Sequence, residues 1–95
     1  MITTKQRATL RGHANKLEAI LQIGKQGVTP TVLKQLNDAL TARELVKCKV
    51  LDNSMLDARG VAQELADAAE CDIVQVIGAK FVLYKQNKKN PVYEI

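Results

Sequence analysis

Three helix-start signals, at Thr3, Thr29 and Asp57, set the organisation of this 95-residue chain. A threonine or aspartate in such a position offers a side-chain oxygen to the unpaired N–H groups of a first helical turn. Behind each signal, apolar residues recur at helical spacing, and a short apolar run that suits a β-strand follows. This alternation of helix and strand predicts an α/β domain.

Each signal has its own supporting residues. Thr3 and Gln6 have the spacing of a capping box, which predicts that the first helix begins directly after the threonine. Pro30 follows Thr29 in the first helical position, where its lack of an N–H group costs nothing. Behind Asp57, the expected buried stripe of the third helix includes Leu65, Ala68 and Ala69.

Four short runs predict strands. Residues 19–23 are mostly apolar, and residues 45–51 alternate, so that Lys47 and Lys49 project from the face opposite to the buried one. The last two runs, residues 73–77 and 81–84, are joined by a turn at Gly78-Ala79. A glycine first in a two-residue loop suits a type II′ turn, so these two strands are expected to form an antiparallel hairpin.

The expected fold is one compact domain over residues 1–95, with elements in the order αβαβαββ. Helices separate the earlier strands, which predicts parallel pairing there and a four-stranded mixed sheet packed with three helices. Residues 86–95 are polar and basic, and they predict a partly ordered tail.

Charge is unevenly distributed along the chain, whose net charge is +4. Residues 1–34 carry six basic residues and one acidic residue, whereas residues 35–79 carry four basic and eight acidic residues. Residues 80–95 carry four basic residues and one acidic residue. Because clustered positive charge attracts polyanions, the basic ends favour a polyanionic partner.

Several functional classes lack support in the sequence. Cys48 and Cys71 are too far apart for a paired-thiol motif, and with the single histidine, His13, they cannot complete a zinc site. The chain has no nucleophile–base pair and no nucleotide-binding glycine pattern. It also lacks an apolar run long enough for a membrane span or a secretory signal. We therefore expect a cytoplasmic protein that is not an enzyme and binds no cofactor or small-molecule substrate.

The most informative local feature is Gly24-Lys25-Gln26-Gly27, which lies between a predicted strand and a predicted helix. Glycines allow positive φ and close approach of a polyanion, and the N-terminus of a helix favours negative charge. Lys25 adds a mobile cation. The alternative is a purely structural turn, because two glycines three residues apart form a weak pattern by themselves.

Further candidate cations lie on the first helix and the second strand. Lys5, Arg7 and Arg11 have no carboxylate near them in the sequence, although surface helices also carry such residues for solubility. Lys47 and Lys49 would form an open basic sheet surface if no helix covers that face. We expect these cations and the glycine loop to converge on one surface that contacts phosphates. Aromatic residues are scarce, so recognition by shape and phosphate is expected rather than base stacking.

Several segments together resemble the YhbY family, bacterial stand-alone versions of the chloroplast RNA splicing and ribosome maturation (CRM) domain. The resemblance covers most of the chain, and the segments that carry it are Thr3-x-Lys5-Gln6-Arg7 with Leu10-Arg11, Gln22-Ile23-Gly24-Lys25-Gln26-Gly27, Glu44-Leu45-Val46-Lys47, and Val74-Gln75-Val76-Ile77-Gly78 with Leu83-Tyr84. The resemblance implies a fold similar to the C-terminal domain of translation initiation factor three, with a Gly-x-x-Gly loop like that of KH domains.

The resemblance also implies a partner, namely structured ribosomal RNA in precursors of the large ribosomal subunit. The expected function is therefore RNA binding that assists ribosome assembly, by a protein that acts as a monomer. The alternative is an adaptor that docks on ribosomal proteins or assembly factors through the acidic residues Glu64, Asp67 and Glu70, without direct RNA contact.

Overall fold

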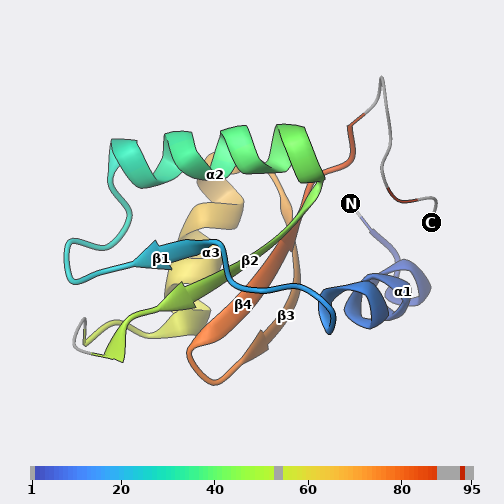
Figure 1. Ribbon diagram of the computed structural model, residues 1–95, viewed down its shortest axis with the longest axis horizontal. Coiled ribbons are helices and arrows are strands. Elements are labelled where there is room, and N and C mark those ends of the chain that lie inside the picture. The colour runs from blue at the N-terminus through green and yellow to red at the C-terminus, as the bar shows by residue number, and fades with distance from the viewer. Residues whose placement is uncertain (1, 53–54, 88–92, 94–95) are drawn as a thin grey trace.

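The computed structural model describes residues 2–52, 55–87 and 93. Its elements follow the predicted order αβαβαββ (Figure 1): α1 (Thr4–Ala14), β1 (Leu21–Ile23), α2 (Pro30–Arg43), β2 (Leu45–Val50), α3 (Ala58–Ala69), β3 (Asp72–Ile77) and β4 (Lys80–Tyr84). Most of the tail expected at residues 86–95 lies outside the described residues. None of the described helices combines the length and the apolar character that a membrane span requires.

The three helix starts are formed by the capping residues that the sequence indicates. Thr3 and Gln6 form the full capping box, because each side chain accepts a hydrogen bond from the other residue's backbone N–H, at 3.1 and 2.9 Å. The Thr29 hydroxyl accepts from a backbone N–H in the first turn of α2 at 3.1 Å, and an Asp57 carboxylate oxygen does the same for α3 at 3.2 Å.

The sheet is mixed, as expected, and its strand order is β1-β2-β4-β3. β1 and β2 are parallel, whereas β4 is antiparallel to both of its neighbours. Gly78 has a φ of 58° at the first central position of the β3–β4 turn, which is the position that requires a positive φ in a type II′ turn. The β4 strand therefore enters the sheet between β2 and β3, far from β2 in the sequence.

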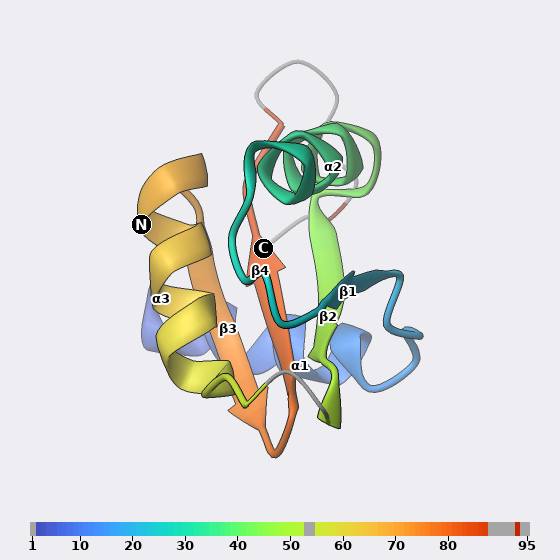
Figure 2. The ribbon, with the colours of Figure 1, turned by 90° about the vertical axis from the view of Figure 1, so that its left-hand side faces the viewer.

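Two helical layers cover the two faces of the sheet unequally (Figures 1 and 2). Helices α2 and α3 lie over one face and α1 lies over the other. The α2/α3 face holds the larger apolar core, which includes Ile23, Leu36, Leu65 and Phe81. The α1 face holds a smaller core, formed by Leu10, Ala14, Leu45, Val74, Val82 and Tyr84.

One expected core residue is placed wrongly by the sequence analysis. Ala68 is exposed, whereas Leu65 and Ala69 are buried as predicted. The buried stripe of α3 continues through Ala66 instead, because Ala68 lies on the helix surface roughly 90° from the middle of the stripe at about 100° per residue.

A buried carboxylate joins the end of α2 to the C-terminal segment. Glu44 ends α2 with a φ of 63° and is 0% exposed. Its carboxylate oxygens accept hydrogen bonds from the backbone N–H groups of Asn87 and of Tyr93, the latter at 2.9 Å. Asn87 and Tyr93 are therefore tied to the end of α2, and Tyr93 packs against the smaller core.

Candidate functional site

The Gly24–Gly27 loop is a tight turn between β1 and α2. The Gly27 N–H donates to the Gly24 carbonyl at 2.9 Å, and Gly27 has a φ of 69°. Gly24, in contrast, does not have a positive φ, and a Cβ there would meet only Leu51 at an ordinary 3.9 Å. The positive φ that glycines allow is therefore used at Gly27 but not at Gly24, whose backbone any residue could adopt.

The loop keeps several groups available for an anion. Lys25 and Gln26 are exposed, and within the described residues their backbone N–H groups have no hydrogen-bond partner. The first turn of α2 contains no acidic residue, so the positive end of its dipole is not neutralised there. The helix start contributes little more, because Pro30 lacks an N–H group and the Thr29 side chain already occupies that of Val32.

Helix α1 and the glycine loop lie at opposite ends of the molecule, whose longest dimension is 36 Å (Figures 1 and 2). The expected convergence of the loop with Lys5, Arg7 and Arg11 is therefore wrong. The physical reason is that β1 runs along the sheet away from α1, and so carries the loop to the far end. Lys5 and Arg11 are exposed, whereas Arg7 is half-buried and its Nε donates to the Ile73 carbonyl at 3.2 Å.

The sheet face beneath α1 is covered only in part, and the strand register defines which part. Leu45 lies opposite Tyr84 in a row that α1 covers, since both belong to the smaller core. At the other end of the same face, Lys49 lies directly opposite Lys80, and Lys80 in turn lies opposite Ile77. Ile77 is 65% exposed. This end of the face is therefore open, as the sequence analysis required for contact between its lysines and a polyanion.

Lys47 lies between the covered and the open ends. It is half-buried, and its ammonium group donates to the Leu17 carbonyl at 3.3 Å, just after α1. No ion pair joins Lys47, Lys49 or Lys80 to a carboxylate within the part of the chain that the structure describes. Like charges directly opposite each other across antiparallel strands destabilise a sheet, so the Lys49–Lys80 pair opposes folding. These three residues are called the sheet-face lysines below.

Lys80 is a candidate that the sequence analysis missed. In the sequence it follows the hairpin turn, thirty-one residues beyond Lys49. The two side chains share a row only because β4 pairs with β2, and local sequence patterns do not predict which strands pair in this way.

The described residues offer no reactive thiol and no metal-binding group. Burial raises the pKa of the Cys48 thiol to about 12 and that of the Cys71 thiol to about 11. The neighbouring Cys71 adds to the rise at Cys48, and the Asp72 carboxylate adds to the rise at Cys71. Among the described residues, no cluster of histidine, cysteine, aspartate or glutamate could hold a metal ion. The described surface is therefore distinguished by its positive charge rather than by reactive groups.

The fold and these surfaces define a small α/β domain with a glycine loop after its first strand and an open basic sheet face. The family model for the CRS1/YhbY (CRM) domain matches residues 2–85, and the chain belongs to this family. Its membership confirms the resemblance seen in the sequence.

Relatives and a solved structure agree with this assignment. The chain is 43% identical over 95 residues to "Probable RNA-binding protein YqeI" of Bacillus subtilis, covering 100% of this chain and 99% of the relative. It is 30% identical over 88 residues to an "RNA-binding protein" of Haemophilus influenzae, covering 93% of this chain and 89% of the relative. The solution structure of hypothetical protein SAV1595 from Staphylococcus aureus, described as a candidate RNA-binding protein, matches with a TM-score of 0.84. The two sequences are 40% identical, and the match covers 100% of this chain and 99% of the SAV1595 chain.

Proposed function

We propose that this chain binds structured RNA by contacting its phosphates, and that it does so without catalysing a reaction. The observation that carries the proposal is the group of sheet-face lysines, of which Lys49 and Lys80 form one row at the open end of the sheet. Lys49 and Lys80 face each other at a cost to stability, and no carboxylate of the described residues neutralises them. A phosphate between them would turn this repulsion into attraction, because each ammonium group would then have an anionic partner.

The glycine loop is a second phosphate contact in this proposal. Lys25 and the free N–H groups of Lys25 and Gln26 can approach a phosphate closely. In the sheet, the residue two positions before the loop, Gln22, pairs with Lys49. The loop and the open end of the sheet therefore belong to neighbouring parts of the molecule, whereas Lys5 and Arg11 at the far end would contact a different part of a long RNA.

The relatives support the class of partner, since they carry names that describe RNA binding. The finer proposal, drawn from the family resemblance, is that the partner is ribosomal RNA in precursors of the large ribosomal subunit. In this proposal the protein acts in the cytoplasm as a monomer and assists subunit assembly. Co-sedimentation with precursors of the large subunit, in gradients of cell extract, tests this finer statement.

Direct binding is tested by fluorescence anisotropy with a labelled fragment of large-subunit ribosomal RNA. If three lysines neutralise three phosphates, the affinity should fall roughly 20- to 40-fold between 50 and 200 mM salt. The variants Lys49→Gln and Lys80→Gln should each weaken binding and reduce the steepness of this dependence by about one phosphate. Lys25→Gln should act in the same direction.

Arg59→Gln is the charge control, because Arg59 is exposed on α3, on the other face of the sheet. It should leave affinity nearly unchanged. Binding that does not depend on salt, or equal losses in Arg59→Gln and the lysine variants, would contradict the proposal. Partners that persist after nuclease treatment and depend on Glu64 and Asp67 would favour the adaptor function instead.

A further inference from the structure

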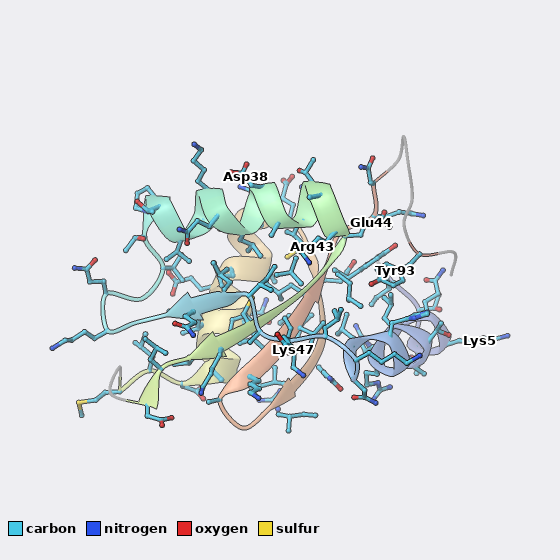
Figure 3. All side chains as sticks on the ribbon, in the orientation of Figure 1. Lys5, Asp38, Arg43, Glu44, Lys47 and Tyr93 are labelled. Atoms are coloured by element: carbon cyan, nitrogen blue, oxygen red, sulfur yellow. The ribbon has the colours of Figure 1, made fainter. Side chains whose placement is uncertain are left out.

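A hollow of about 570 Å³ lies beside Lys47, between the end of α1, the last turn of α2 and the start of β2. Pockets that hold small molecules or single ligand groups have volumes of roughly 300–1,000 Å³, so this hollow could accommodate one nucleotide unit. Figure 3 shows Arg43, Lys47 and Tyr93 together on this side of the molecule, whereas Lys5 lies at the far end of α1.

The lining of the hollow is predominantly positive. Lys16 comes from the turn after α1, Arg43 from the last turn of α2 and Lys47 from β2, and Glu18 is the acidic residue among the lining residues. None of the three cations forms an ion pair with a carboxylate of the described residues. The nearby Glu44 carboxylate does not line the hollow, and it already accepts two backbone N–H groups. The lining therefore favours an anionic ligand.

Part of the lining is apolar and exposed. Ile20, which directly precedes the edge strand β1, is 47% exposed, although most large apolar residues of the chain are buried. Tyr93 is half-buried, and its ring lies against that of His13 with centroids 4.9 Å apart. An aliphatic side chain and a fixed ring beside three cations match the two chemical parts of a nucleotide, a planar base and a phosphate.

The position of Lys47 connects this hollow to the surface described above. Its ammonium group is held at the Leu17 carbonyl, which fixes the charge at the wall of the hollow instead of leaving it free in solvent. An RNA backbone that contacts the sheet-face lysines could therefore continue into the hollow and remain in contact with positively charged side chains along the way.

We propose that this hollow binds one unpaired nucleotide of an RNA, with its phosphate contacting Lys16, Arg43 and Lys47 and its base against Ile20 and Tyr93. The inference rests on the proposed RNA-binding function and deepens it, because it specifies which RNA the protein distinguishes. A fully paired helix can engage the sheet-face lysines, but only an RNA with an unpaired nucleotide can also fill the hollow.

The test uses the full chain and two labelled RNA hairpins that differ by a single bulged nucleotide. The wild-type protein should bind the bulged hairpin roughly tenfold more tightly than the paired one, as expected for one base held against apolar side chains. Ile20→Ser should remove most of this preference while leaving affinity for the paired hairpin unchanged. Thermal melting confirms that this exposed substitution preserves the fold.

The phosphate contact is tested separately with Arg43→Gln, and Arg59→Gln is its matched control on another helix. Arg43→Gln should weaken binding of the bulged hairpin roughly tenfold and reduce its salt dependence by about one phosphate, whereas Arg59→Gln should do neither.

Equal affinity of the wild-type protein for the two hairpins, or equal effects of the two arginine variants, would overturn the inference about the hollow. In that case, salt-dependent binding that still requires Lys49 and Lys80 would leave the proposed function intact. If the wild-type protein bound neither hairpin nor the ribosomal RNA fragment, both proposals would fall together.

Discussion

The two faces of the sheet differ in how completely helices cover them. On the α2/α3 face, fifteen buried residues of the described chain form one core, whereas on the α1 face only six do so. The larger core includes buried residues of β1, β2 and β4, and the partly buried Ile73 and Val76 of β3 pack against it. The smaller core ends before the row of Lys49, Lys80 and Ile77. One face therefore supplies most of the apolar stabilisation, and the other leaves basic side chains available for binding.

This difference shows how a domain of 95 residues can combine a stable fold with a basic sheet surface. Burial of apolar area is roughly additive, so one well-filled core can compensate for a second face that is only half covered. Repulsion between Lys49 and Lys80 costs little in comparison.

A leucine-to-alanine substitution should cost more on the α2/α3 face than on the α1 face. Leu65 and Leu10 are both 0% exposed. Leu65→Ala should lower the free energy of unfolding by about 3–5 kcal/mol, because the surrounding core can relax only partly around the cavity. Leu10→Ala should cost about 2–3 kcal/mol, because α1 can shift on its smaller contact. Urea denaturation measures both values. Equal costs would show that the two faces contribute equally.

High pH should destabilise the α2/α3 face through Cys48. Its pKa is about 12 in the folded chain and 9.0 in its ordinary state, so the unfolded chain loses this proton first. The resulting stability is fully present below pH 9 and is lost as pH rises towards 12. Over this range the wild-type protein should lose on the order of 2–4 kcal/mol more than Cys48→Ala. A parallel pH dependence of the two proteins, measured by urea denaturation, would contradict this prediction.

Removal of the Glu44 carboxylate should loosen the attachment of Asn87 and Tyr93 to the end of α2. Glu44→Ala takes away the acceptor of the Asn87 and Tyr93 N–H groups and should cost about 1–3 kcal/mol. Hydrogen exchange of these two amides should become faster, while exchange in β4 stays slow. Glu44→Gln keeps one acceptor oxygen and should have an intermediate effect. Unchanged exchange at both amides would show that the carboxylate does not hold these two residues.

Reversing one charge of the Lys49–Lys80 pair should stabilise the protein slightly while it weakens RNA binding. Lys80→Glu replaces repulsion across the strands by attraction, worth about 0.2–1 kcal/mol. Lys49→Glu should behave in the same way, and the double variant should lose both gains because it restores like charges. Thermal melting and anisotropy measure the two effects on the same samples. A stabilised variant with undiminished RNA affinity would show that the Lys49–Lys80 pair does not take part in RNA binding.

Local chemistry made much of the fold predictable. The capping pairs at Thr3, Thr29 and Asp57 act within one helical turn, so their outcome does not depend on distant segments. The alternation that sets Lys47 and Lys49 opposite Val46 and Cys48 follows from the two-residue period of any strand. The glycine loop was also placed correctly between β1 and α2, although only one of its glycines needs a positive φ.

The arrangement of the candidate site could not be predicted in the same way. Lys25 and Arg11 both belong to the basic N-terminal third of the sequence. In the structure they lie at opposite ends of a 36 Å molecule, because β1 runs away from α1 and carries the glycine loop to the far end. Conversely, Lys49 and Lys80 are distant in the sequence and become direct neighbours when β4 enters between β2 and β3.

By itself, the sequence determined the identity and order of the helices and strands, the hairpin turn and the excess of positive charge, because these depend on interactions between residues close together in the chain. Only the tertiary structure decided which cations share a surface, where α1 leaves the sheet open and where the hollow beside Arg43 lies. Those features depend on strand order and on helix docking, which bring together residues from different elements and are governed by the packing of the whole domain.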